Sequence, residues 1–212
     1  MNQPESPDLL DPVDLIYQSG LAIVPNFIPA DLCQALRDDA GVLLAEGEFH
    51  RAGVGRGGEL RTNDAVRRDS IYWLDGRTAA QQAYLACMED YRIALNRRCL
   101  LGLLDYEAHY AHYQPGEFYR KHVDAFRGRS NRRVTTVLYL NHAWQADWGG
   151  QLEIFNEQDE SLLKVDPQGG TLVSFLSDEF PHQVLPSLRN RLSIAGWFRI
   201  NQSLAGVIDP AS

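Results

Sequence analysis

Apolar residues in the first hundred positions recur at the spacing of an α-helix. They predict helices at 9–20, 29–47 and, most clearly, 78–101, because apolar side chains three and four positions apart line one helix face. A proline near the start of each of the first two segments and a glycine at the end mark their boundaries. Two short stretches between the helices, 21–27 and 70–76, are typical of strands.

Beyond residue 106 the pattern changes to short strands. The predicted strands are 107–114, 134–140, 151–155, 161–165, 170–176 and 191–200. They are rich in β-branched and aromatic residues and are separated by glycine, proline, asparagine and aspartate. Helices followed by strands predict an α+β protein whose strands are numerous enough to close into a sandwich or a jelly roll.

The segment 50–68 follows neither pattern. It contains four glycines, with Gly47 just before it, and shows no helical or strand period. Long irregular segments in compact domains are usually functional or disordered, so we interpret this one as a mobile loop. A chain of 212 residues fits one domain. We therefore expect a single domain over 1–212, with mainly helical support and the loop in 1–105 and the β-core in 106–200.

Composition narrows the class of protein. Hydrophobic residues make up 44% of the chain and charged residues 23%, values typical of a globular protein that folds on its own. No segment resembles a secretory signal or a membrane span, so we expect a cytoplasmic protein without a membrane partner. The net charge of -8 argues against nucleic acid as a partner, since binding phosphates needs an excess of lysine and arginine. Cys33, Cys87 and Cys99 lack metal-type and disulfide spacing and are expected to be reduced core thiols.

A histidine and an aspartate two positions apart, His122 and Asp124, are the first candidates for chemistry. In an extended strand these side chains point to the same face, but such a pair is also an ordinary polar pair facing solvent. His182, which follows a short turn after a predicted buried strand, changes the interpretation. Two histidines and one carboxylate can occupy one face of an octahedral Fe(II) ion and leave the other face open for substrate and O2. We therefore predict that these three residues bind a metal.

Arg191 lies inside an apolar strand, where burying an unpaired guanidinium is costly. The planar guanidinium binds a carboxylate through two hydrogen bonds, which suits the distal carboxylate of a dicarboxylic cosubstrate. The alternative is a structural ion pair with a carboxylate of the core.

Together the H-x-D pair, the distant histidine and the R-x-S sequence at 191–193 resemble the pattern of the iron(II) and 2-oxoglutarate dependent dioxygenases. Within that superfamily the chain resembles the prolyl 4-hydroxylases, especially the hypoxia-inducible-factor prolyl hydroxylases and their bacterial relatives. The resemblance covers about 65–200 and is carried by five ordered segments: "RRDSIYWLDG", "HYQPGEFYRKHVD", "VTTVLYLN", "WGGQLEIF" and "FPHQVLPSLRNRLSIAGWF". It implies a double-stranded β-helix, a distorted jelly roll, supported by the N-terminal helices.

The resemblance also implies a cosubstrate site. Arg191 and the hydroxyl of Tyr139 would bind the distal carboxylate of 2-oxoglutarate, and Tyr113 would line the same pocket; the alternative is that both tyrosines are core aromatics. The fourth position after the arginine, often a hydroxyl residue in this branch, is Ala195 here. Ser193 is then the residue expected to supply that hydrogen bond.

The activity implied by the resemblance is hydroxylation of a proline at C4 in a protein substrate. Fe(II) at His122, Asp124 and His182 would couple O2 to the decarboxylation of 2-oxoglutarate to succinate and CO2, with ascorbate supporting activity. The loop at 50–68 would close over the peptide, and elongation factor Tu is the candidate substrate. The residues expected to contact the peptide are Arg67, Asp69, Trp73 and Trp197.

Two other functions remain open at this point. The first is an oxygenase of the same fold that acts on a small molecule or, like the AlkB group, on nucleic acid. The second is a non-catalytic relative that senses oxygen or iron, against which the presence of all three ligand residues and of Arg191 counts. The remaining histidines, His50, His109, His112 and His142, are interpreted as structural or loop residues.

Overall fold

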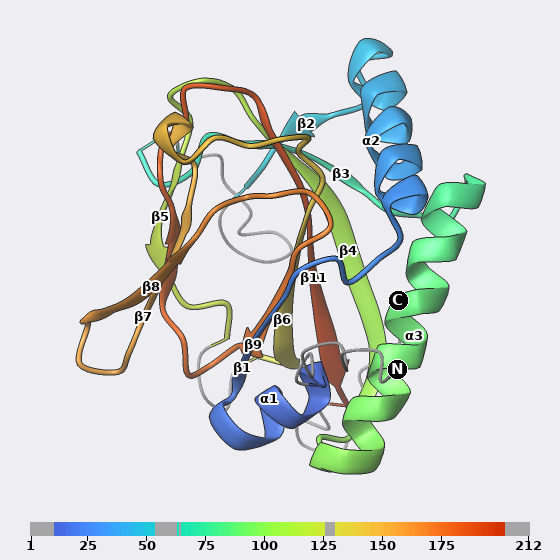
Figure 1. The fold of residues 1–212 in the computed structure, drawn as a ribbon, viewed down its shortest axis with the longest axis vertical. Helices are drawn as coiled ribbons and strands as arrows, with labels where there is room; N and C mark the ends of the chain where they lie inside the picture. The colour runs from blue at the N-terminus through green and yellow to red at the C-terminus, as the bar shows by residue number, and fades with distance from the viewer. Residues whose placement is uncertain (1–10, 54–62, 64, 126–129, 202–212) are drawn as a thin grey trace, which may run out of the picture.

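A computed structural model describes residues 11–53, 63, 65–125 and 130–201 (Figure 1). Its helices are α1 (Pro12–Ser19), α2 (Ala30–Ala45), α3 (Ala79–Cys99) and the short 3-10 helix η2 (Ala146–Trp148). Its strands are β1 (Leu21–Val24), β2 (His50–Arg51), β3 (Ser70–Trp73), β4 (Leu103–Tyr113), β5 (Tyr119–His122), β6 (Arg132–Tyr139), β7 (Leu152–Phe155), β8 (Ser161–Val165), β9 (Leu172–Leu176), β10 (His182–Val184) and β11 (Arg191–Ile200).

The strands form two antiparallel sheets. The larger has the order β1-β9-β6-β11-β4-β3-β2, and the smaller has the order β5-β10-β7-β8. In Figure 1 the small sheet lies on one side of the large sheet, and α2 and α3 lie on the other. This arrangement confirms the predicted α+β class with a jelly-roll core and helical support.

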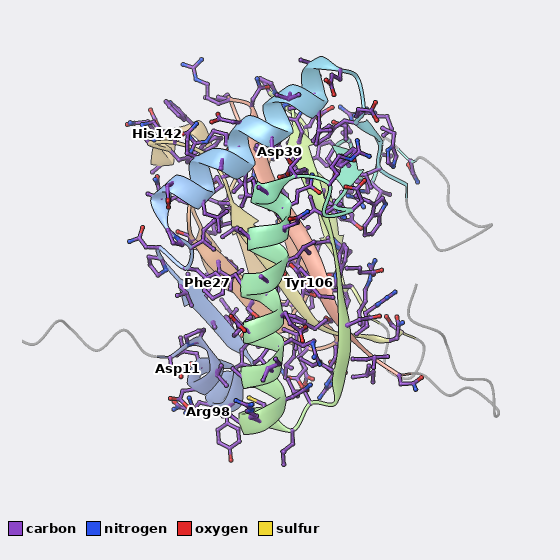
Figure 2. All side chains as sticks on the ribbon, turned by 90° about the vertical axis from the view of Figure 1, so that its right-hand side faces the viewer. Asp11, Phe27, Asp39, Arg98, Tyr106 and His142 are labelled. Carbon is purple, nitrogen blue, oxygen red and sulfur yellow. The ribbon has the colours of Figure 1, made fainter. Side chains whose placement is uncertain are left out.

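Strand alternation gives the large sheet two different faces, because successive side chains point to opposite sides. One face carries Tyr110, Leu138 and Ile194, which pack with apolar residues of α2 and α3 in the main hydrophobic cluster. The opposite face carries Tyr113 and Tyr139, which belong to a second cluster shared with the small sheet. Figure 2 shows α2 and α3 running across the first of these faces. The cavity described below lies on the second face.

The predicted helices are present, with ends that differ by a few residues. Asp11 accepts a hydrogen bond from the Val13 N–H at the start of α1, and Thr78 does the same for the Gln81 N–H at the start of α3. Gly20 ends α1 with a φ of 71°, in the left-handed region that favours glycine. Local capping therefore sets these boundaries, as the sequence indicated.

Three predictions about secondary structure need correction. Strands β5 and β10 were not expected, and β4 begins at Leu103 rather than at 107. His50, assigned to a loop, lies in β2, where it pairs with Ile71 of β3. The strands expected at 21–27 and 70–76 are present as β1 and β3, and both belong to the large sheet. The sequence missed β2, β5 and β10 because elements of two to four residues are too short to show a period.

Most of the predicted loop at 50–68 lies outside the described residues, so its mobility stays a prediction. Among the described residues no helix is both long and apolar enough to cross a membrane. All three cysteines are free thiols, with Cys33 buried and the other two partly exposed.

Candidate metal centre and active site

His122, Asp124 and His182 meet in space, with one potential ligand atom from each lying within 4.8 Å of the others. The Nε2 atom of His122 is 3.5 Å from one Asp124 carboxylate oxygen, and the Nε2 atom of His182 is 3.6 Å from the other. Sheet pairing causes the meeting, because His122 at the end of β5 lies directly opposite His182 at the start of β10. Two imidazoles and a carboxylate at this spacing match the facial arrangement that binds Fe(II).

The sequence analysis considered His122 and Asp124 on one face of an extended strand, but the two residues do not share a strand. The strand β5 ends at His122, and Asp124 occupies a bend two residues later. The chain bends there because the Ala125 N–H donates to the carbonyl of Ser177, the residue that follows β9, at 3.3 Å. The hydroxyl of Thr135 then donates to the Asp124 carboxylate at 2.8 Å and fixes its direction. A hydrogen bond from the neighbouring sheet therefore replaces the expected strand geometry.

The protonation of the two histidines suits metal binding. The Nδ1 atoms of His122 and His182 lie 2.8 and 3.1 Å from the carbonyls of Arg120 and Phe180, so both Nδ1–H groups can donate and leave the Nε2 lone pairs free. Burial, reinforced by His122, lowers the pKa of His182 to about 4, which keeps the ring neutral at physiological pH. Burial alone would raise the pKa of Asp124, but the two histidines hold it well below its usual range. The centre therefore offers two neutral nitrogens and one carboxylate.

A cavity of about 610 Å³ lies above these three residues, between the two sheets. A volume of this size is typical of small-molecule sites. The large sheet beneath it consists of cross-strand rows of β4, β11 and β6, and most residues of these rows line the cavity. From the far end toward the metal ligands the rows are Tyr113–Arg191, Ala111–Ser193–Tyr139, His109–Ala195–Val137 and Glu107–Trp197–Thr135.

Arg191 is buried at 1% exposure, and the alternative interpretation, a structural ion pair, finds no carboxylate partner among the described residues. Its Nε donates to the Gly150 carbonyl at 2.9 Å and its Nη1 to the Ser193 hydroxyl at 3.2 Å, while Nη2 has no partner in the described chain. No described aspartate or glutamate forms an ion pair with it. A buried guanidinium with a donor that no described residue accepts is suited to bind an anionic ligand.

Tyr113 and Tyr139 lie beside this guanidinium. The guanidinium carbon of Arg191 lies 5.1 Å from the ring centre of Tyr113 and 5.2 Å from that of Tyr139. The Tyr139 hydroxyl is buried and has no hydrogen-bond partner among the described residues. Burial raises its pKa to about 12, so the hydroxyl stays protonated and can donate. Ser193, a predicted cosubstrate contact, lines the cavity and accepts a hydrogen bond from Arg191 that holds the guanidinium in place.

The predicted substrate contacts divide into two groups. Trp73 and Trp197 line the cavity, with Trp73 at 42% exposure near its edge and Trp197 buried. Arg67 also lines it but forms a buried ion pair with Asp69, at 2.7 Å between Arg67 Nε and the carboxylate. Asp69 is 1% exposed and is not part of the cavity wall, so its carboxylate is the partner that holds the Arg67 guanidinium in place.

Several residues of the site were not singled out from the sequence. Tyr119 stacks on the His122 ring with 3.6 Å between ring centres, and the Arg67 guanidinium lies 4.4 Å from the centre of the Tyr119 ring, so both contacts support the position of this metal ligand. Thr135 orients Asp124, and His109, assigned a structural role, lines the cavity. The signal for both was available, because even spacing from Tyr139 and Tyr113 along a strand places a residue on the same face.

Comparison with known proteins agrees with this geometry. A family model described as the 2OG-Fe(II) oxygenase superfamily matches residues 108–199. The hypoxia-inducible factor prolyl hydroxylase of Caenorhabditis elegans is 31% identical over an alignment 206 residues long, which covers 86% of this chain but only 27% of that protein. This chain therefore spans about a quarter of that relative.

Two solved structures are similar over nearly the whole chain. A Pseudomonas putida prolyl-4-hydroxylase is 43% identical with a TM-score of 0.82, and the match covers 90% of this chain and 98% of the other. A Trichoplax adhaerens prolyl hydroxylase, solved with a peptide of the hypoxia inducible factor oxygen degradation domain, is 27% identical with a TM-score of 0.79, covering 89% and 87%. With this match and the facial ligand set in place, the chain belongs to the 2-oxoglutarate and Fe(II) dependent oxygenase superfamily, whose members use Fe(II), 2-oxoglutarate and O2.

Proposed function

We propose that this chain is a prolyl 4-hydroxylase that acts on a proline in a protein substrate. The observation that carries the proposal is one cavity with a 2-histidine-1-carboxylate cluster at one end and the unpaired donors of Arg191 and Tyr139 at the other. The similarity to the Pseudomonas putida and Trichoplax adhaerens enzymes supports proline as the target. A peptide bound in the second of these structures supports a protein substrate.

The three residues of the cluster would hold Fe(II) through the Nε2 atoms of His122 and His182 and the carboxylate of Asp124. The chemistry supplied by bound Fe(II) is the coupling of O2 to decarboxylation of 2-oxoglutarate, giving succinate, CO2 and a hydroxylated product. Thr135 keeps the carboxylate aimed at the centre, and the carbonyls of Arg120 and Phe180 fix the histidine tautomers. The protein contributes orientation and burial and needs no separate general base.

The cosubstrate would lie over the sheet floor. Arg191 would bind the distal carboxylate of 2-oxoglutarate with its free Nη2, and Tyr139 would donate its hydroxyl to the same group. The Tyr113 ring forms the wall beside the guanidinium. Ser193 and the Gly150 carbonyl hold the guanidinium still, so less conformational freedom is lost on binding.

The peptide would enter at the edge of the cavity, where Trp73 is exposed and Arg132 lies over the Trp197 ring at 3.5 Å. Arg67 and Asp69 are proposed to act here as a pair rather than as separate contacts. We keep elongation factor Tu as the first substrate to test, the cytoplasm as the compartment and ascorbate as a supporting reductant.

The test is turnover with Fe(II), 2-oxoglutarate, O2 and ascorbate. Succinate would be measured together with the mass of elongation factor Tu and of synthetic proline peptides, and the expected result is the gain of one oxygen atom on a proline. Peptides in which alanine replaces the proline serve as the control. If succinate forms but no proline substrate gains oxygen, the oxygenase chemistry stands and the prolyl assignment is wrong.

A further inference from the structure

The imidazole of His109 is the buried polar group of the cavity to which no role has been given so far. His109 is 2% exposed, and neither ring nitrogen has a hydrogen-bond partner among the described residues. Its ring lies against those of Trp73 and Trp197, at centroid distances of 4.9 and 5.4 Å. Buried polar groups in native proteins are almost always paired with protein, water or ligand, because an unpaired one costs free energy. His109 therefore indicates a partner other than the residues that the structure describes.

The surroundings of His109 make it a neutral hydrogen-bond donor. Its cross-strand neighbours, Trp73 and Ala195, carry no accepting side-chain atom. Burial, reinforced by the positive charges of Arg67 and Arg132, lowers the pKa of His109 well below its usual range. A neutral imidazole has one N–H donor and one acceptor nitrogen. The ring thus offers an uncharged donor at the cavity wall.

The cross-strand rows place His109 midway between the two ends of the site. The guanidinium of Arg191 is level with Ser193, to which it donates, whereas Asp124 is level with Trp197, because it is bonded to Thr135 in that row. These two levels are four residues apart along β11, which is roughly 13 Å. The row of His109 and Ala195 lies halfway between them.

Ala195 leaves the way open from His109 to the cavity. It is the small residue of its row, it is only half-buried, and it lines the cavity next to the imidazole. A ligand that reaches from the guanidinium of Arg191 to the metal ligands therefore passes beside the His109 ring. The distal carboxylate would already be bound at the level of Ser193, so the part of the ligand near His109 is the other end.

We propose that His109 donates a hydrogen bond to the 2-oxo-acid end of bound 2-oxoglutarate and thereby positions the cosubstrate. This inference rests on the proposed function and adds a positioning residue to it. 2-Oxoglutarate presents oxygen acceptors and no donors, which matches the N–H of a neutral imidazole. The contacts with Trp73 and Trp197 hold the ring in one orientation, so that the donor is in place before the ligand binds.

Calorimetric titration of 2-oxoglutarate into the Mn(II)-loaded protein tests the proposal without turnover. His109→Phe keeps an aromatic ring between the two tryptophans and removes both nitrogens, so the dissociation constant is expected to rise about tenfold. His109→Gln restores an N–H donor of similar reach and should recover part of the affinity. Thermal unfolding of each Mn(II)-loaded variant without 2-oxoglutarate checks that the fold is intact.

His112→Phe is the matched control. His112 lies on the same strand but on the opposite face, against Phe49, with ring centres 6.4 Å apart, and does not line the cavity. It is expected to leave the dissociation constant unchanged. An equal dissociation constant of 2-oxoglutarate for the wild type and His109→Phe would overturn the proposed role of His109. A higher KM of His109→Phe for a proline peptide at unchanged affinity for 2-oxoglutarate would overturn it too. No binding of 2-oxoglutarate to the wild type would instead contradict the proposed function itself.

Discussion

The two faces of the large sheet bury polar groups in opposite ways. On the helix-covered face they pair with one another: the Tyr106 hydroxyl lies 2.8 Å from both the Tyr84 and the Thr136 hydroxyls, and Tyr110 donates to Asp39 of α2 at 2.8 Å. Figure 2 places Tyr106 beside α3 and Asp39 on α2. Gly196 makes room for these hydrogen-bonded hydroxyls, because a Cβ at this position would lie 2.2 Å from the Tyr106 hydroxyl oxygen.

On the cavity face the pairing is incomplete. In the described chain, the buried side-chain nitrogens and oxygens without a partner belong to His109, Tyr139, Arg191 and Trp197. His109, Arg191 and Trp197 line the cavity, and Tyr139 lies beside Arg191 on the same face. Both faces belong to the same strands and both are buried, so they differ in which groups complete the hydrogen bonds of their polar side chains. On the helix-covered face the described residues complete them, and on the cavity face they leave donors open, as the proposed ligand site requires.

Removing a metal ligand is expected to have the largest effect. Asp124→Ala deletes the carboxylate that both histidines approach, so the protein should lose Mn(II) binding, and succinate formation should fall to background. Calorimetry with Mn(II) and a succinate assay measure both. Thr135→Val, which removes only the hydrogen bond to this carboxylate, should weaken metal binding about tenfold. Turnover by Asp124→Ala would contradict the assignment of the metal centre.

Removing the guanidinium should separate ligand binding from folding. Arg191→Met fills similar space without a buried charge, so it should raise the dissociation constant of 2-oxoglutarate about a hundredfold or more. Because Arg191 forms no ion pair with a described carboxylate, the ligand-free variant should melt within a few degrees of the wild type, as the cost of its lost hydrogen bonds offsets the relief of burying a charge.

Thermal unfolding with and without 2-oxoglutarate measures this separation. The ligand should raise the Tm of the wild type and leave that of Arg191→Met unchanged, since only a bound ligand stabilises the folded state. A large loss of stability in the ligand-free variant would mean that Arg191 is a structural residue, and the alternative of a core ion pair would return.

Removing the same hydroxyl from each face compares them directly. Tyr106→Phe leaves Tyr84 and Thr136 short of a partner, so it should lower the free energy of unfolding by about 1–3 kcal/mol without changing the affinity for 2-oxoglutarate. Tyr139→Phe removes a hydroxyl that bonds to no described residue, so its stability should be unchanged while the affinity falls about tenfold. Urea unfolding and calorimetry on both variants test the pair; equal destabilisation by both would remove the distinction between the faces.

The sequence could predict the fold class and the meeting of the metal ligands. Strand alternation and ordered motifs were enough to predict the jelly-roll core, which the structure confirms. The motif also predicted that His122, Asp124 and His182 lie together, as they do in the structure. The bend at Asp124 was not predictable, because it depends on a hydrogen bond from Ala125 to Ser177, more than fifty residues away in the chain. Local spacing carries no information on such a contact.

The unpaired state of His109 was equally hidden. Even spacing from Tyr113 could place it on the cavity face, but its lack of a partner depends on Ala195 standing opposite, which the register of β4 on β11 decides. The same holds for Arg191, because the lack of a counter-ion depends on which residues the fold places around the guanidinium. Sequence patterns identify the polar groups, and only the assembled sheet shows which of them remain unpaired.

The smallest effect is expected where water can complete the hydrogen bonds. Arg98 of α3 pairs with Asp11 at 2.6 Å across the surface, where Figure 2 shows both residues near the end of α3, and each side chain is nearly half exposed. Arg98→Ala should change the free energy of unfolding by less than about 1 kcal/mol and leave 2-oxoglutarate binding unchanged, because solvent replaces the lost partner. Urea unfolding decides the matter. A loss as large as that of Tyr106→Phe would show that partners matter regardless of burial, and unpaired buried atoms would then no longer single out the cavity face as the ligand site.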